Sequence, residues 1–244
     1  MLAEEIALAS LAAMIFYLAT RKSFVASIAW LLLAAACAAK VPDFLAGGDY
    51  YNTAIFSAAI FVFALVAFAA RESMYPVTRF SALALAVYFP FAFTHLGDLL
   101  ILATAELTVA LGNALGFPML RDGSYVLLNG HAVEIILACT AIESMSLFSG
   151  ATLGIKAETS RKLKAFLASV PTIYLLNLLR NVFVTVSFAY SLFGENSFYV
   201  AHHVVAKVLA TIALVAIAYC VFKLLPELFD AVSRLVDELT AIFR

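Results

Sequence analysis

The chain has 244 residues, of which 65% are hydrophobic and only 13% are charged, and its formal net charge is −1. Soluble domains carry about 25% charged residues, so this composition excludes a soluble globular protein and indicates an integral membrane protein that crosses the bilayer several times. The near-zero net charge leaves no basic field that would attract nucleic acid, and we expect no nucleic-acid partner.

The hydrophobic pattern predicts an all-α polytopic membrane protein with about seven transmembrane helices, because a bilayer core needs about 20 apolar residues per helix. The predicted spans are residues 5–20, 24–40, 52–70, 79–95, 133–154, 164–190 and 201–223. The final stretch, 224–244, alternates charged and apolar residues and is expected to form an amphipathic helix on the membrane surface. We expect residues 1–244 to form a single integral membrane domain.

The basic loops set the expected orientation, since Lys and Arg remain on the cytoplasmic side. Four basic segments mark that side: Arg21-Lys22, Arg71 to Arg79, Lys156 to Lys164, and the residues from Lys223 onward. The spans then alternate correctly only if residues 97–115 do not cross fully. We therefore expect 97–115 to be an interfacial or re-entrant helix on the outer side, and residues 224–244 to form a cytoplasmic tail.

The outer segment, residues 96–132, contains two dipeptides typical of hairpin turns, Asp122-Gly123 and Asn129-Gly130. Between them, residues 125–128 read as a short strand. The sequence therefore predicts a small β-hairpin outside the membrane, directly before the helix that carries Cys139. The alternative is an irregular loop.

Three consecutive spans bring chemically active residues to one level near the outer face. Cys139 lies near the outer end of span 133–154. Arg180 lies 16 residues beyond Lys164, about 24 Å up the next span. His202 begins the last span at the same side, with His203 beside it. Residues 133–223 are thus predicted to be a catalytic core of three helices.

Each of these residues also has a purely structural interpretation. Cys139 alone reads as a small core hydrophobe, whereas an intramembrane cation such as Arg180 is a functional hypothesis by default. Glu143, four residues after Cys139, is expected on the same helix face. It orients Arg180 in one interpretation and forms a structural ion pair in the other.

Three further polar residues are assigned as supporting residues. Asn177 and Asn181 flank Arg180, and Ser144 follows Glu143. The two asparagines either bind a backbone group or only satisfy contacts between helices. The histidines at the helix start are functional in one interpretation and interfacial in the other.

Cysteine, arginine and histidine together describe a site for acyl transfer. A thiol attacks an acyl carbon as the thiolate, which a nearby cation or a histidine base stabilises. An arginine can also face the oxyanion of the tetrahedral intermediate, where a low dielectric strengthens the interaction. A histidine can then protonate the leaving amine.

Three sequence blocks, ACTAIES (138–144), NLLRNVF (177–183) and AHHVVAK (201–207), resemble the exosortase/archaeosortase family in this order, and the archaeosortases most closely. The resemblance covers roughly residues 110–225. It implies that Cys139 is the nucleophile, that Arg180 is the essential arginine, and that His202 transfers the proton. His203 stands where the family has Asn and is the second candidate.

Two further positions bear on the resemblance. Lys223 is the remaining basic candidate, at the inner end of its span. Ala141 replaces the glycine that usually follows the threonine of the cysteine motif.

The resemblance implies a cysteine transpeptidase in the cell membrane, active at the extracellular face and independent of any cofactor. Its expected substrates are surface-protein precursors with a C-terminal tripartite signal: a Pro-Gly-Phe-type motif, a transmembrane helix and a basic tail. The new carboxyl end would pass to the amine of a membrane phospholipid similar to archaetidylethanolamine. Cleavage by water, which would make the protein a plain protease, is the alternative.

Two rival hypotheses remain open. The first is a zinc enzyme built on the outer-side residues His95, Asp98, His131, His202 and His203, although their spacing matches no metal motif. The second is a transporter or scaffold in which Arg180 and Glu143 line an ion pathway, although the sequence has no internal repeat.

Overall fold

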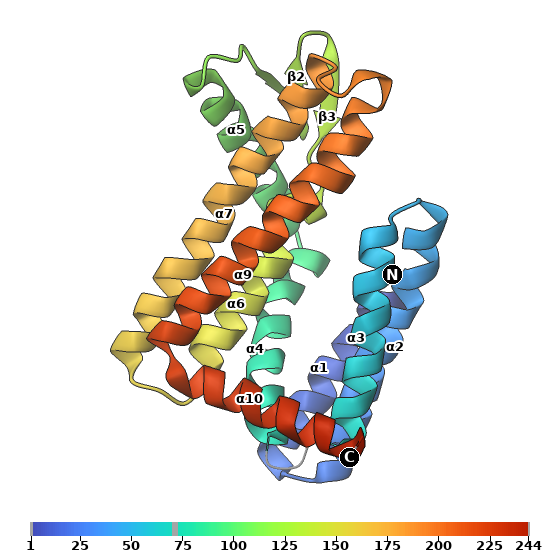
Figure 1. The fold of residues 1–244 in the computed structure, drawn as a ribbon, viewed down its shortest axis with the longest axis vertical. Helices are drawn as coiled ribbons and strands as arrows, with labels where there is room; N and C mark the ends of the chain where they lie inside the picture. Colours follow the sequence, from blue (N-terminus) through green and yellow to red (C-terminus); the bar gives the residue numbers. More distant parts are fainter. Residues whose placement is uncertain (1, 70–72, 244) are drawn as a thin grey trace. The chain divides into compact units, whose positions relative to one another are not determined.

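The computed structural model describes residues 2–69 and 73–243 and is built mainly of helices (Figure 1). Within these residues, seven helices are long and apolar enough to cross a membrane. They are α1 (Leu2–Thr20), α2 (Ser23–Ala46), α3 (Tyr50–Ala69), α4 (Met74–Phe93), α5 (Leu96–Ala114), α7 (Thr159–Ala189) and the continuous helix Gly194–Leu224. The predicted all-α polytopic fold is confirmed.

The set of candidate spans differs from the predicted set at one place. Residues 133–154 do not form one helix, and the prediction of a continuous span there is wrong. They contain the end of strand β3 (His131–Glu134), the 3-10 helix η1 (Leu137–Thr140) and helix α6 (Ile142–Gly154) of 13 residues. Such a helix is about 20 Å long, shorter than a bilayer core of about 30 Å. Helix α5 has the length and composition of a span, and its interfacial placement stays a prediction.

The remaining boundaries follow the hydrophobic pattern with small shifts. Helix α7 begins at Thr159, so most of the basic segment before Lys164 is helical. Arg71 lies outside the described residues. The last span contains η2 (Gly194–Asn196), α8 (Ser197–Tyr199), the π-helix η3 (Val200–Val205) and α9 (Ala206–Leu224). The expected amphipathic helix forms as α10 (Pro226–Thr240), followed by η4 (Ala241–Phe243).

The chain divides into two compact units. The first comprises residues 1–86, 150–162 and 225–244, and the second comprises residues 87–149 and 163–224. All the predicted site residues belong to the second unit.

Close backbone approach and polar anchors hold the first unit together. The sequence GATLG at the end of α6 places Gly150 and Gly154 against α4, where a Cβ on Gly150 would lie 2.4 Å from the carbonyl oxygen of Phe80. Only glycine permits this contact, which is the small-residue packing typical of membrane helices. The indole N–H of Trp30 donates to the buried hydroxyl of Thr78 at 3.0 Å.

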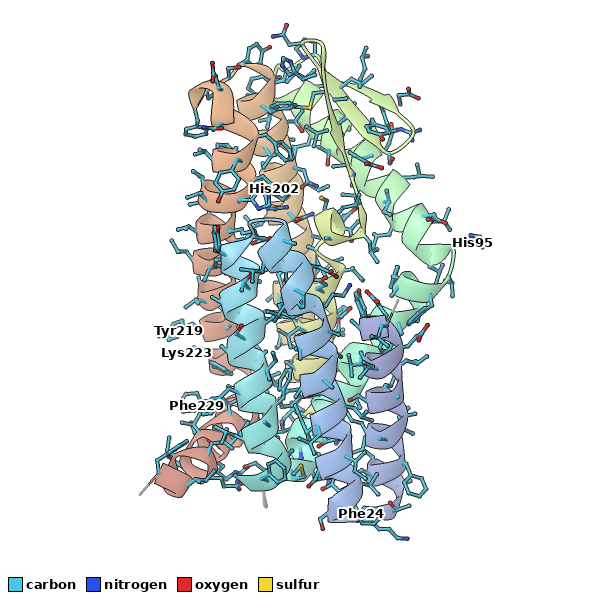
Figure 2. The ribbon with its side chains drawn as sticks, turned by 90° about the vertical axis from the view of Figure 1, so that its right-hand side faces the viewer. Phe24, His95, His202, Tyr219, Lys223 and Phe229 are labelled. Carbon is cyan, nitrogen blue, oxygen red and sulfur yellow. The ribbon has the colours of Figure 1, made fainter. Side chains whose placement is uncertain are left out.

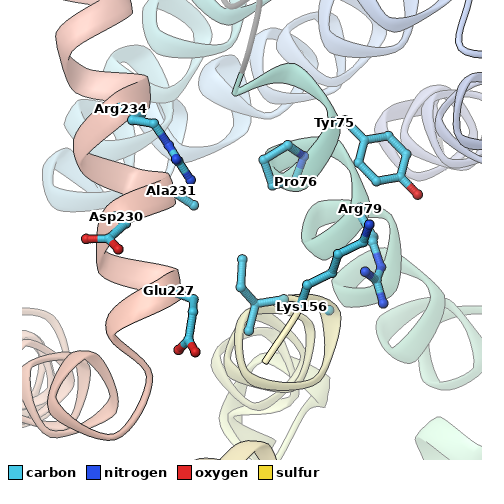
Figure 3. A pocket seen from close by; sticks show the side chains of 10 residues that line it. Tyr75, Pro76, Arg79, Lys156, Glu227, Asp230, Ala231 and Arg234 are labelled. Carbon is cyan, nitrogen blue, oxygen red and sulfur yellow. The ribbon is translucent and has the colours of Figure 1, made fainter. Parts of the chain in front are cut away.

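Helix α10 is anchored to the first unit near both ends. Glu227 pairs with Arg161, whose guanidinium holds the pKa of that carboxyl below its usual range. Ser73 donates its backbone N–H and its hydroxyl to Glu238, at 3.0 and 2.9 Å. A cavity of about 330 Å³ lies between these anchors, and Arg234 points into it from α10 while Asp230 points away (Figure 3).

The second unit carries a three-stranded antiparallel sheet in the order β1-β2-β3. The strands are β1 (Leu120–Asp122), β2 (Tyr125–Leu128) and β3 (His131–Glu134). Both predicted turns form. Asn129 and Gly130 have φ of 49° and 76°, as a two-residue hairpin turn requires, and Gly123 has φ of 58°. The expected hairpin is therefore present, with a third strand where the start of a helix was expected.

The sheet packs its apolar face on α5 and on the last two turns of α7. The buried residues of this core are Ala105, Val109, Met119, Val126, Leu128, Ile135, Val182 and Ala189. The side-chain amide of Asn129 donates to the carbonyl of Ala189 at 3.0 Å, which ties the hairpin tip to the end of α7. With 31 residues, α7 is about 46 Å long and exceeds the bilayer core. The sheet lies beside the upper end of this helix (Figure 1).

Candidate active site

Cys139 lies in a turn between the sheet and α6. Ile136 continues β3 in an extended conformation, and the backbone N–H of Cys139 donates to the carbonyl of Ile136 at 2.8 Å. The side chain of Cys139 is half-buried against the core of the second unit. A thiol in such a turn is presented at the edge of the packed core rather than buried inside a helix.

Two buried asparagines hold the backbone of Cys139 from α7. The side-chain amide of Asn177 donates to the carbonyl of Cys139 at 2.7 Å, and that of Asn181 donates to the same carbonyl at 3.1 Å. Asn177 and Asn181 lie one turn apart on α7, and both are less than 9% exposed. Of the two interpretations of these residues, the structure realises the one in which they bind a backbone group.

Arg180 lies on α7 between the two asparagines, and its guanidinium is within hydrogen-bonding and electrostatic reach of the Cys139 thiol. The side chain is partly buried. The cation, the thiol and both amides are therefore brought together by one face of α7 and one turn of the chain. A guanidinium in this place can stabilise a thiolate or an oxyanion.

The relation between Cys139 and Glu143 differs from the prediction. Ala141, between them, has φ of 59° and ψ of 16°, in the left-handed region, which ends η1 before α6 begins. The expected arrangement at i and i+4 on one helix face is therefore wrong. Glu143 lies in the first turn of α6 and is exposed, and Ser144 next to it is partly buried.

The family resemblance leads one to expect glycine at position 141. The left-handed backbone conformation there explains this preference. An L-residue pays about 1–2 kcal/mol in this region, whereas glycine adopts it freely. Ala141→Gly is thus expected to raise the free energy of unfolding by about 1 kcal/mol, which is about 2–4 °C in Tm for a chain of this size. Thermal unfolding of the purified protein measures it.

Ala138→Gly is the matched control for this prediction. Ala138 lies in the same turn, and its φ is negative. Glycine there only loosens the chain and lowers stability by about 0.5–1 kcal/mol. Equal shifts for the two variants would contradict the strain at Ala141.

His202 lies in the π-helix η3, within a ladder of aromatic rings. Its ring stacks on Phe198, with centroids 5.3 Å apart and planes 7° apart, and meets the His203 ring edge-on at 4.6 Å. Single π turns inside longer helices occur frequently at functional sites. The role of His202 in proton transfer stays a prediction, as does the alternative role of His203.

Lys223 occupies the other end of the same long helix. It follows His202 by 21 residues, about 31 Å along the axis, and Figure 2 shows the two labels well apart. His202 and Lys223 therefore cannot both adjoin one thiol, and the choice between them stays a prediction.

The residues of the zinc hypothesis do not converge. His95 is fully exposed and contacts Asp98 at 3.3 Å, and Figure 2 shows it projecting from the surface. His131 packs edge-on against Phe188, with centroids 4.8 Å apart. Among residues 2–69 and 73–243, no group of three His, Cys, Asp or Glu side chains has the placement to hold a metal ion.

Thr140 is a site residue that the residue analysis missed. It is fully buried, its hydroxyl donates to the carbonyl of Leu137 at 2.7 Å, and the N–H of Ile142 points to that hydroxyl at 3.4 Å. The sequence carried a signal for it. Thr140 followed by Glu143 three residues later is the capping-box pattern of a helix start.

Comparison with known proteins agrees with the family resemblance. The model of the transmembrane exosortase family matches residues 4–222. Archaeosortase A of Natronomonas pharaonis is 34% identical over an alignment of 203 residues, which covers 70% of this chain and 64% of that protein. Archaeosortase A of Haloferax volcanii is 29% identical over 257 aligned positions, which cover 88% of this chain and 85% of that protein.

No solved structure matches the chain. The match spans less than two thirds of the Natronomonas protein and most of the Haloferax protein. The family model covers all the candidate site residues, from Cys139 to His203. The chain is a multi-pass membrane protein that belongs to the transmembrane exosortase family.

Proposed function

We propose that this protein is an archaeosortase-like cysteine transpeptidase. It cleaves the C-terminal tripartite signal of surface-protein precursors and transfers the new carboxyl end to an amine of a membrane phospholipid. The observation that carries the proposal is the contact of Arg180 with the Cys139 thiol, in a turn whose carbonyl accepts two amide hydrogen bonds.

In the first half-reaction, the Cys139 sulfur attacks the scissile carbonyl and forms a tetrahedral intermediate. The guanidinium of Arg180 stabilises the attacking thiolate or the oxyanion that develops. His202 takes the proton of the Cys139 thiol and passes it to the departing amine, which leaves with the C-terminal helix of the signal. The products are a thioester on Cys139 and the released peptide.

In the second half-reaction, a lipid amine attacks the thioester carbonyl. His202 takes the proton of the attacking nitrogen, the C–S bond breaks, and the thiol of Cys139 is restored. The acceptor is a phospholipid whose headgroup ends in a primary amine, such as archaetidylethanolamine. Water in place of the amine gives hydrolysis, and the protein is then a protease.

In this proposal the reaction takes place at the extracellular face. The basic residues Arg21, Lys22, Lys156 and Lys223 mark the cytoplasmic ends of their helices under the positive-inside rule. Arg180 and the sheet lie toward the other end of α7. A precursor anchored by its own helix would present its signal motif at that level.

The proposal is tested with a precursor that carries a Pro-Gly-Phe-type C-terminal signal and an epitope tag beyond its terminal helix. Wild-type protein is expected to remove the tag and to leave a lipid mass on the new C-terminus, measured by gel shift and mass spectrometry. Cys139→Ala is expected to abolish tag loss, whereas Cys220→Ala, an exposed thiol on α9, is expected to retain it.

The outcomes separate the hypotheses. Tag loss without a lipid mass reduces the function to proteolysis. Tag loss that persists in Cys139→Ala, with several tripartite signals tried, contradicts cysteine catalysis and favours a role without this nucleophile.

A further inference from the structure

Strand β3 is an edge strand, and its outer edge leads to the nucleophile. The sheet order is β1-β2-β3, so β3 pairs with β2 on one side alone. Beyond β3 the chain passes through Ile136 to Cys139, where the N–H of Cys139 returns to the carbonyl of Ile136. The end of the edge and the catalytic turn are thus joined by a hydrogen bond.

The register of the hairpin fixes which backbone groups of β3 face outward. Leu128 pairs with His131 across the two-residue turn, and the N–H of Ile135 donates to the carbonyl of Ser124 at 2.9 Å. In an antiparallel ladder, hydrogen-bonded pairs alternate with non-bonded pairs. The backbone N–H and C=O of Val133 therefore point to β2. Those of His131 and Ile135 do the same.

The alternate residues point their backbone groups away from β2. These are the N–H and C=O of Ala132 and Glu134, and the N–H of Ile136. Within the described part of the chain, none of these groups has a hydrogen-bond partner. The side chains of Ala132, Glu134 and Ile136 are all exposed. Such a row of unpaired groups is a template for another extended chain.

Space for a side chain adjoins the end of this edge. A cavity of about 350 Å³ lies between the first turns of α5 and the strand end, and it is lined in part by Asp98, Leu102, Glu134 and Ile136. An extended peptide on β3 would place its backbone about 4.8 Å from the strand and alternate side chains toward and away from the sheet surface.

We propose that the outer edge of β3 binds the cleavage segment of the precursor as an added antiparallel or parallel β-strand, with main-chain hydrogen bonds to Ala132, Glu134 and Ile136. This inference rests on the proposed function and names how that site binds its peptide. Strand addition would hold the scissile peptide extended and fixed in position beside the thiol, so that the sulfur can approach its carbonyl carbon. Main-chain pairing gives affinity, and the adjoining cavity selects one side chain.

The test removes one backbone donor from the edge. Glu134→Pro deletes the outward N–H, and proline is tolerated on edge strands. Glu134→Ala keeps this N–H and measures the contribution of the side chain alone. We expect kcat/KM for cleavage of the tagged precursor to fall about tenfold or more in Glu134→Pro relative to Glu134→Ala, since about 1.4 kcal/mol corresponds to tenfold.

Arg121→Pro on the opposite edge is the matched control. Arg121 opposes Val126 in β1, in a non-bonded pair, so its N–H also points away from the sheet. Its side chain makes an exposed ion pair with Glu106 at 2.6 Å, which contributes at most about 1 kcal/mol to stability. Cleavage by Arg121→Pro is expected to stay within threefold of wild type. An equal loss in both proline variants would overturn the inference.

A second measurement leaves the protein unchanged. A synthetic peptide that spans the cleavage segment is N-methylated at one backbone amide at a time and is used to compete with the tagged precursor. Strand addition predicts that loss of competition alternates with a period of two residues. Uniform loss, or none, would overturn it.

The two proposals fail in distinguishable ways. In a Cys139→Ala background the precursor is expected to remain bound during purification, and Glu134→Pro is expected to release it. Normal cleavage by Glu134→Pro, while Cys139→Ala is inactive, removes the edge inference and leaves the proposed function intact. Cleavage by Cys139→Ala removes the proposed function. A second copy of this chain could instead occupy the edge. A dimer that Glu134→Pro dissociates without loss of cleavage would show this and would contradict peptide binding there.

Discussion

Arg180→Gln is expected to lower kcat for signal cleavage by about 10²–10³-fold, the usual loss when one donor to a developing oxyanion is removed. The guanidinium is within hydrogen-bonding reach of the Cys139 thiol, and the Arg180 side chain is partly buried. Arg180→Lys keeps the charge and loses the planar fork of donors, so it should recover only a small part of the rate. The measurement is single-turnover cleavage of the tagged precursor by protein reconstituted in lipid.

A second readout separates chemistry from folding. The rate at which iodoacetamide alkylates Cys139 at fixed pH is expected to fall about tenfold in Arg180→Gln, because the thiolate loses its cation. The experiment uses a background of Cys37→Ala and Cys220→Ala, so that Cys139 is the remaining thiol.

Arg121→Gln is the control for the loss of an arginine. Arg121 lies in the same unit, where its side chain forms an exposed ion pair with Glu106. Cleavage by this variant should remain within twofold of wild type. If Arg180→Gln cleaves within threefold of wild type while Cys139→Ala is inactive, Arg180 has a structural role.

The hydrophobic pattern was sufficient to predict most of the helical fold. Stretches of about 20 apolar residues have no alternative to helix in a bilayer, because every backbone group must be satisfied within its own segment. The two turn dipeptides located the hairpin, since Asn129 and Gly130 both adopt positive φ there. Apolar stretches and turn dipeptides depend on residues that are neighbours in the chain, so a single sequence is enough to predict them.

The region around Cys139 was predicted less well, because two local signals conflicted. The run EIILACTAIESMSLF is apolar enough to read as helix from end to end. The helix start marked by Thr140 and Glu143 was the competing signal, and it prevailed because residues 131–134 pair with β2. The break at Ala141 then places Cys139 outside α6.

Contacts between distant elements could be predicted only in part. The position of Arg180 toward the far end of its helix followed from counting residues, whereas Cys139 lies in a turn that counting along a span could not place. That both asparagines reach one carbonyl depends on how α7 packs against the turn, which spacing alone does not determine. The π-helix around His202 has no sequence signature comparable to a capping box or an Asn-Gly turn.

The paired amides on the Cys139 carbonyl predict a strongly non-additive double variant. In Asn177→Ala or Asn181→Ala, the remaining amide still donates to the carbonyl, so each single change should lower kcat/KM only severalfold. In the double variant the carbonyl has neither amide, and an unsatisfied buried acceptor costs about 1–3 kcal/mol. We therefore expect a loss of about 100-fold or more, with a coupling free energy of about 1–2 kcal/mol in the double-mutant cycle.

A positioning role and a purely structural role make different predictions for this cycle. If the amides hold the thiol against Arg180, the double variant should lower kcat more than it raises KM, and alkylation of Cys139 should slow as it does in Arg180→Gln. If they only stabilise the fold, Tm should fall by about 2–4 °C per kcal/mol while kcat of the folded fraction and the alkylation rate are retained.

Thr185→Val is the control for a loss of stability without a change at the thiol. It removes a buried hydroxyl that donates to the Asn181 carbonyl at 2.9 Å on the same helix. When one asparagine is lost, the other still donates to the same carbonyl, so the loss should be large only when both are changed. Additive effects of the two changes on kcat/KM would contradict this shared support.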